Sequence, residues 1–171
     1  IDMSGVDFAS RINTYNAIIS NTFAGSLDGA GTNPGEVYSI YGLSNVSISN
    51  IATDYSGFAL FNEIDGATIK NINIAETDNE MPTKFVNTFA NKQTNMLKLA
   101  IVAKTSTNST LNNVNVPNAQ IGLTGSGKIQ AISYIGGLIA TANNTSIIDC
   151  SINLVVDLQA DFVPASGASI Y

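Results

Sequence analysis

The residues that could do chemistry in this chain are mainly its acids, because the 171-residue sequence contains no histidine. Histidine is the commonest general base and metal ligand. A Ser-His-Asp triad, a Cys-His pair or an HExxH zinc site therefore cannot be built from this chain alone. Paired carboxylates could still cleave glycosidic bonds. The acids considered for that role are Asp7, Asp28, Asp65, Glu76, Asp78 and Glu80.

Sequence order does not show which of these acids converge, and basic residues to neutralise an acidic sugar are scarce, with Arg11 and six lysines. We therefore expect no catalytic residues, no metal and no cofactor in this segment. A cluster of three or more acids or lysines on one exposed face would instead favour a polysaccharide-active enzyme. The run Glu76, Asp78 and Glu80 offers oxygen ligands of the kind calcium prefers, but it lacks the spacing and glycine of an EF-hand. We interpret it as a solvated acidic loop.

Two short motifs have simpler interpretations. Residues 122–128 (GLTGSGK) nearly spell a phosphate-binding loop, but Ile129 replaces the required Ser or Thr and a strand, not a helix, is predicted to follow. This stretch is interpreted as a glycine turn. Cys150 has no histidine to activate it and falls in a column otherwise filled by Val and Ile, so a buried apolar role is predicted.

Residues 76–95 are predicted to be an insertion, either a loop or a short helix. Pro82 stands at a plausible first helical position, and Met81, Phe85 and Phe89 then fall on one helical stripe. The stripe either packs onto the wall of the fold or contacts a partner protein. The candidate binding residues are Glu76, Asp78, Glu80, Phe85 and Phe89.

Composition excludes several classes of protein. The net charge is −6, and the 7 basic residues form no stripe that could neutralise phosphates, so neither nucleic-acid binding nor adhesion to an anionic membrane is expected. No apolar run approaches the roughly 20 residues of a membrane span. One cysteine excludes an internal disulfide. We expect a single domain over residues 1–171, cut from a larger protein.

A repeat organises the chain. A hexapeptide of apolar, any, Asn or Asp, apolar, any and apolar residues occurs at residues 43–48, 69–74, 111–116 and 147–152. Its starts are 26, 42 and 36 residues apart (69−43, 111−69, 147−111). Removing residues 76–95 and 117–128 leaves 22 and 24 residues, within the roughly 20–30 residues of one solenoid turn. The Asn column is Asn45, Asn71, Asn113 and Asp149.

These short runs of Ile and Val alternate with polar residues, which predicts half-buried strands. One turn of such strands cannot bury its apolar face, whereas stacked turns can, with Asn side chains hydrogen-bonded along the stack. The predicted fold is therefore all-β, a right-handed parallel β-helix, with Leu43, Ile69, Leu111 and Ile147 in register. A β-sandwich is the competing interpretation, but it does not require the same residue type at the same phase in each unit.

The chain resembles the GLUG-type repeat regions of bacterial surface proteins over roughly residues 23–158, and the resemblance is carried by residues 23–31 (FAGSLDGAG), 57–61 (GFALF), 66–74 (GATIKNINI) and 134–150. Such regions occur in immunoglobulin A-specific zinc metalloproteases and in adhesins. The resemblance implies a β-helical, non-catalytic module, secreted or on the cell surface, that binds a host glycoprotein or a neighbouring domain. The proteases' HExxH motif is absent, so any such catalysis lies elsewhere in the parent protein. An adhesin passenger domain and a polysaccharide lyase or hydrolase remain the alternatives.

Overall fold

The computed structural model describes residues 1–3, 17–44, 46–48, 55–76, 81–89, 95–126, 129 and 133–159. Within these ranges the chain is all-β: strands are present and helices are not, so no helix there could cross a membrane. The strands are β1 (Ile19–Phe23), β2 (Ser26–Asp28), β3 (Tyr38–Ile40), β4 (Val46–Ile48), β5 (Phe61–Asp65), β6 (Thr68–Ile74), β7 (Thr83–Thr88), β8 (Leu97–Leu99), β9 (Ala103–Thr107), β10 (Thr110–Thr124), β11 (Ser133–Ile135), β12 (Ile139–Asn143), β13 (Ser146–Ile148) and β14 (Ser151–Leu158).

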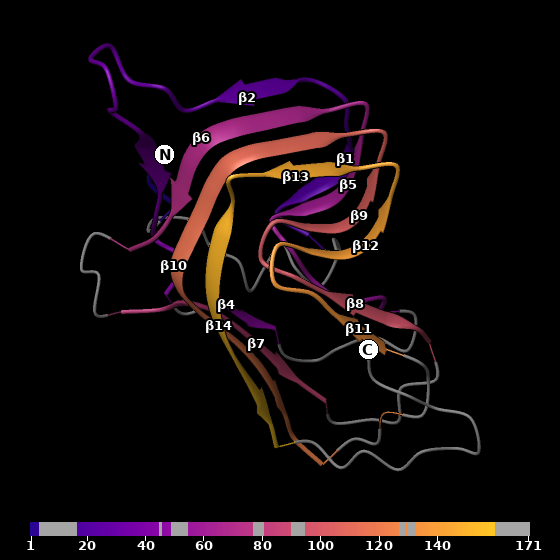
Figure 1. Ribbon diagram of the computed structural model, residues 1–171. Coiled ribbons are helices and arrows are strands. Elements are labelled where there is room, and N and C mark those ends of the chain that lie inside the picture. Colours follow the sequence, from indigo (N-terminus) through magenta and orange to yellow (C-terminus); the bar gives the residue numbers. More distant parts are fainter. Residues whose placement is uncertain are drawn as a thin grey trace.

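The pairings between these strands are all parallel. Strands β1, β5, β9 and β12 lie side by side in chain order and form one sheet. A larger sheet has the order β2-β6-β10-β7-β4, with β3 on β6 and with β13 and β14 on β10, and it curls strongly (Figure 1). Strands β8 and β11 form a third, two-stranded sheet. Two facing antiparallel sheets, the competing interpretation of the sequence, are therefore not what these residues form.

Strand register defines layers that are longer than the sequence suggested. Leu27 lies beside Ile69, Ile69 beside Leu111, and Leu111 beside Ile147, at separations of 42, 42 and 36 residues (69−27, 111−69, 147−111). The shorter repeat obtained by removing residues 117–128 was wrong, because β10 continues as a strand through Thr124 and pairs with β7 and β14.

The predicted column of four apolar residues is correct for three of its members. Ile69, Leu111 and Ile147 are in register, but the fourth place belongs to Leu27, not Leu43. Leu43 is buried, and it precedes β4, which pairs with β7 and not with β6. The hexapeptides at residues 43–48 and 69–74 have the same alternation of apolar and polar residues. Such alternation specifies which face of a strand is buried, but it does not specify which strand lies beside it.

The short helix expected in residues 76–95 is wrong. Thr83–Thr88 forms strand β7, which lies between β4 and β10. Burial alternates along it, with Thr83, Phe85 and Asn87 inside, because side chains of a strand point to opposite faces in turn. The buried residues recur with the period of two of a strand and not with the period of 3.6 of a helix, and the run was too short for its sequence to distinguish the two periods. Register changes from 42 (115−73) to 36 (119−83) across this region, so only 6 residues (42−36) are extra.

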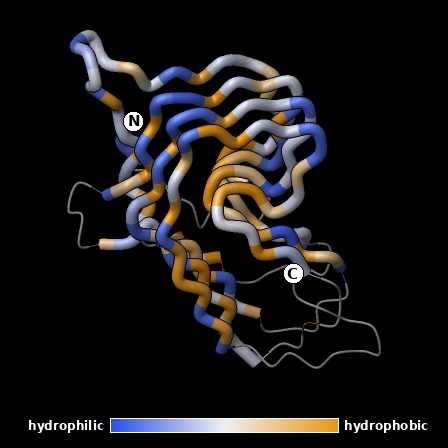
Figure 2. The backbone as a smooth tube through the Cα atoms, in the orientation of Figure 1, coloured by the Kyte–Doolittle hydropathy of each residue, from blue (hydrophilic) through white to orange (hydrophobic). Residues whose placement is uncertain are grey.

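Hydrophobic and hydrophilic positions alternate along much of the chain (Figure 2), and the buried positions of the strands are mainly hydrophobic. Ile72 and Ile74 are buried, as their inward assignment predicted. Aromatic rings complete the core, and the ring of Phe58 meets that of Phe85 edge-on at 5.0 Å between centroids. The core has one continuous cluster of buried residues rather than separate cores for each sheet.

Asparagine or aspartate recurs at one corner of three successive layers for a backbone reason. Asn71, Asn113 and Asp149 adopt left-handed backbone with φ of 54°, 53° and 49°, a conformation that Asn and Asp tolerate better than most residues. The predicted stacking is confirmed between two of them, because Asn113 Nδ2 donates to Asn71 Oδ1 at 3.1 Å. Asn45, the first member of the predicted column, lies outside the described residues.

Candidate functional site

The five candidate binding residues do not form one exposed cluster in the described structure. Phe85 and Phe89 are 1% and 0% exposed, so their rings offer no surface to a partner in the folded chain. Glu76 accepts hydrogen bonds from the backbone N–H groups of Leu43 at 2.5 Å and Gly42 at 3.0 Å, which joins the end of β6 to the segment before β4. Asp78 and Glu80 lie outside the described residues, so the proposed acidic loop stays a prediction.

Among the other acids, Asp28 is held as a carboxylate by its neighbours. Hydrogen bonds from Asn71 and from the backbone N–H of Ala30, together with Lys70, lower the pKa of Asp28 to about 2. Lys70 Nζ lies 3.0 Å from Asp28 Oδ2. A group ionised throughout the neutral range cannot serve as a general acid. Asp65 is exposed at the end of β5, and Asp7 lies outside the described residues.

Cys150 and the glycine-rich residues 122–128, the two remaining motifs of the sequence, lie in surroundings that fit a structural role. Cys150 packs against the core and its Sγ lies 3.1 Å from the carbonyl oxygen of Ile148 and 3.4 Å from the backbone nitrogen of Val114. The first three of residues 122–128 belong to strand β10. In a phosphate-binding loop these residues would form a loop that leads into a helix. Within the described ranges, no group of three or more His, Cys, Asp or Glu side chains is placed to hold a metal ion.

A polar pocket that sequence analysis did not identify lies where β5, β8 and β9 meet the segment before β5. Its volume is about 430 Å³. It is lined by Ser56, Asn62, Glu63, Met96, Lys98, Lys104 and Thr105. The pocket therefore collects two of the chain's seven basic residues, in a protein of net charge −6.

Local structure explains why these side chains converge. Lys98 is the central residue of β8, and since Leu97 and Leu99 are buried, its side chain leaves the opposite face. Gly57 has a φ of 106°, and a Cβ there would overlap the backbone of Lys98, so glycine allows the segment before β5 to approach β8 closely. Strand β5 pairs with β9, with Glu63 beside Thr105.

Lys104 lines the pocket and is only 4% exposed. Its Nζ donates to Ser56 Oγ at 3.0 Å, while Lys98 Nζ donates to Thr105 Oγ1 at 3.0 Å. Burial, and then the neighbouring charge of Lys98, lower the pKa of Lys104 to about 8. Lys70 and Asp28 form an ion pair, whereas Lys98 and Lys104 form no ion pair with a residue of the described part of the chain.

Glu63 is the acid of the same pocket. One of its carboxylate oxygens, Oε2, accepts a hydrogen bond from the hydroxyl of Thr22 at 2.9 Å. One pocket thus contains three charged residues, Glu63, Lys98 and Lys104. Such a group of acids and lysines is the feature that would favour a polysaccharide-active protein. Sequence spacing could not reveal this, because the strands that carry Glu63 and Thr105 are neighbours across 42 residues (105−63).

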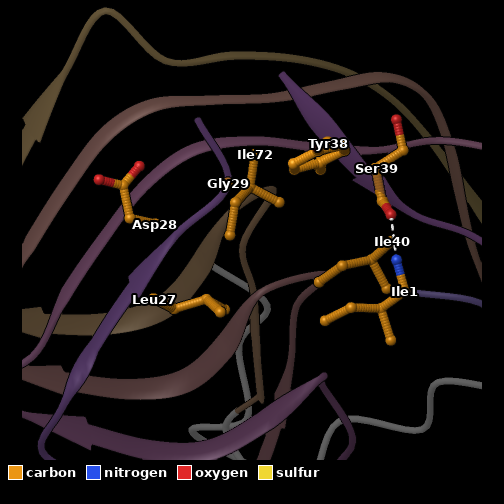
Figure 3. Close-up of a pocket in the computed structure, with 8 residues that line it drawn as sticks. All are labelled: Ile1, Leu27, Asp28, Gly29, Tyr38, Ser39, Ile40 and Ile72. Carbon is orange, nitrogen blue, oxygen red and sulfur yellow. Dashed lines mark hydrogen bonds between the residues drawn. The ribbon is translucent and has the colours of Figure 1, made fainter. Parts of the chain in front are cut away.

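A second pocket, of about 280 Å³, lies beside β2 and β3 (Figure 3). Leu27, Ile40 and Ile72 contribute apolar side chains, and Ile1 closes one side, its amino group donating to Ser39 O at 2.6 Å. The pocket offers few polar groups to orient a ligand, so its chemistry is that of an apolar contact surface.

The last layer of strands exposes apolar side chains that earlier layers bury. Ile147 is 51% exposed, whereas its register partner Leu111 is 0% exposed. Leu158 is 46% exposed, and its partner Leu123 is 0% exposed. The same residue type in the same column is therefore buried or exposed according to whether a further strand lies beside it.

Comparisons of the chain with protein-family models, with curated proteins and with solved structures find no match.

Proposed function

We propose that the chain is a right-handed parallel β-helix that serves as a non-catalytic module of a secreted or cell-surface bacterial protein. The proposal is supported by strands that pair in parallel with the strand one layer earlier, in three separate sheets. Parallel crossover connections are right-handed in about 98% of cases. The GLUG-type resemblance of residues 57–74 and 134–150 supports a bacterial surface protein.

The observation that carries the proposal is the apolar edge of the last layer. Ile147, Val156 and Leu158 are exposed there although their register partners in β10 are buried, because nothing in the described structure lies beyond β13 and β14. Exposed large apolar residues at one edge of a fold point to an interaction site. The occupant that fits best is another layer of parallel strands, because Ile147 and Leu158 continue columns that such layers bury. The exposed residues are Ile147, Ile148, Val155, Val156 and Leu158.

A stacked module of this kind is a rigid rod in which each layer contacts its neighbours only. Such a rod supports an adjoining domain of the same chain or presents loops to a partner, and a host glycoprotein is the partner that the resemblance suggests. In a parent protein of the immunoglobulin A-specific metalloprotease type, the module would serve substrate recognition. An adhesin passenger domain would use the same architecture.

Polysaccharide cleavage is the second candidate function, and the pocket with Glu63, Lys98 and Lys104 is the observation that favours it. Incubation of the chain with acidic polysaccharides, followed by chromatography of the products, separates the two functions. Products released by the chain, but not by a Lys104→Met variant, would contradict the non-catalytic assignment.

The apolar edge can be tested by sedimentation. We expect the chain to self-associate as its concentration rises, because the open edge of one molecule can pair with the strands of another. A variant with Ile147→Lys and Val156→Lys, both at positions whose partners in β10 are buried, should remain monomeric. The matched control is Met81→Lys, which introduces a charge at a residue that is 48% exposed, close to the 51% of Ile147, but lies outside the last layer.

Self-association that survives the double substitution, or a chain that is monomeric at every concentration, would contradict the role assigned to this edge. Circular dichroism of each variant establishes that the β-structure is retained.

A further inference from the structure

We propose that the pocket formed by Ser56, Asn62, Glu63, Lys98, Lys104 and Thr105 binds the carboxylate of an acidic sugar, a uronate unit of a glycan. The two lysines would pair with the carboxylate, and the neutral polar groups would bond to the sugar hydroxyls. This assignment goes beyond the scaffold role, and either can fail without the other.

Charge is the first argument. Two ammonium groups line one pocket, and neither has a carboxylate partner within the described residues. Their mutual repulsion is relieved when an anion lies between them, and the relief is larger in a partly desolvated pocket than in water. The protein as a whole is acidic, so the pocket is a local positive site in a negative surface.

The donor capacity of Lys104 is the second argument. An ammonium group has three donors, and Lys104 Nζ makes a hydrogen bond to Ser56 Oγ. Its other donors can therefore bond to a molecule in the pocket that Lys104 lines. Burial also depresses the pKa of Lys104, which an anion beside the group would reverse.

The rest of the lining points to a sugar rather than to a simple anion. Asn62 and Glu63 supply an amide and a carboxylate, and Thr105 supplies a hydroxyl, the groups that recognise vicinal hydroxyls. With two lysines and Glu63 in one pocket, the charged side chains sum to about +1, which matches a singly charged carboxylate better than a multiply charged phosphate, and Glu63 can accept hydrogen bonds from sugar hydroxyls. The volume of about 430 Å³ falls within the range of small-ligand sites.

Calorimetric titration of the whole chain with a trimer of galacturonate tests the proposal. We expect saturable binding that weakens as salt is added, since the contact is an ion pair. A neutral galactose trimer should bind at least tenfold more weakly. Lys98→Met and Lys104→Met should each lower the affinity for the galacturonate trimer at least tenfold.

The matched control is Lys70→Met, which removes the same charge from β6 at a site paired with Asp28, and which should leave binding unchanged. Lys98 is partly exposed, so its substitution tests the pocket even if Lys104→Met unfolds. Absence of binding, equal binding of the neutral trimer, or full binding by Lys98→Met would overturn the proposal. A glutamate tripeptide that bound as tightly as the galacturonate trimer would overturn the assignment to a sugar.

Discussion

Asparagine and lysine behave differently in this fold at the scale of single residues. Asn71 and Asn113 occupy left-handed corners, where their side chains also bond to one another. Asn108 and Asn144 repeat the arrangement at a second corner, with Asn144 Nδ2 donating to Asn108 Oδ1 at 2.7 Å. The corner asparagines thus meet a backbone requirement and a stacking requirement at once.

Lys104 should make stability depend on pH in an unusual direction. Its pKa is about 8 in the folded chain, below its ordinary 10.5, so the unfolded chain binds more protons between these values. The free energy of unfolding should therefore rise with pH across that window. Between about pH 7 and about pH 9.5 the gain should be about 2 kcal/mol relative to Lys104→Met.

Urea unfolding of both proteins at the two pH values measures the difference, and other titrating groups cancel because they are common to both. Parallel pH slopes for the parent chain and the variant would show that Lys104 is not desolvated as described.

Strand β7 shows most clearly what an element contributes. It joins β4 to β10 in the larger sheet, and its inward residues Thr83, Phe85 and Asn87 are buried. If residues 76–95 were the predicted insertion, the fold would not depend on them. The pairing of β7 on both sides leads us to expect the opposite.

Phe85→Ala should destabilise the chain by about 3–5 kcal/mol, because it removes a buried ring and leaves a cavity against Phe58. Thermal unfolding followed by circular dichroism measures the loss. Met81→Ala, at an exposed position beside the same strand, is the control and should change stability by less than about 0.5 kcal/mol. A small effect of Phe85→Ala would show that β7 is peripheral to the core.

Layers stacked in parallel determine the behaviour of the whole molecule. Strands β5, β9 and β10 have neighbours on two sides, whereas β12, β13 and β14 have a neighbour on one side within the described structure. Local opening costs less free energy where fewer contacts must break. The molecule is therefore expected to loosen from its last layer inwards.

Hydrogen exchange should reveal this gradient. Backbone amides of β9 and β10 should exchange more slowly than those of β12, β13 and β14, because the central strands open only with larger units of the fold. Mass spectrometry of exchanged peptides provides the measurement. Equal protection across all layers would mean that the molecule unfolds as one unit and not by successive layers.

The sequence by itself determined the strand character of the chain and the direction of many side chains. Alternation of apolar and polar residues was enough to place Ile72 and Ile74 inside, since a period of two assigns faces without knowledge of neighbours. Recurrent Asn or Asp at one phase also predicted which segments stack, and the register of Ile69, Leu111 and Ile147 confirms three of the four predicted segments.

Only the tertiary structure decided which strands are neighbours and what their meeting creates. Leu27 rather than Leu43 completes the apolar column, and Phe85 belongs to a strand rather than a helix. The pocket around Lys104 arises from β5, β8 and β9, which the layer repeat brings together from distant parts of the chain. Pairing is chosen by long-range packing, which a local pattern of six residues does not encode.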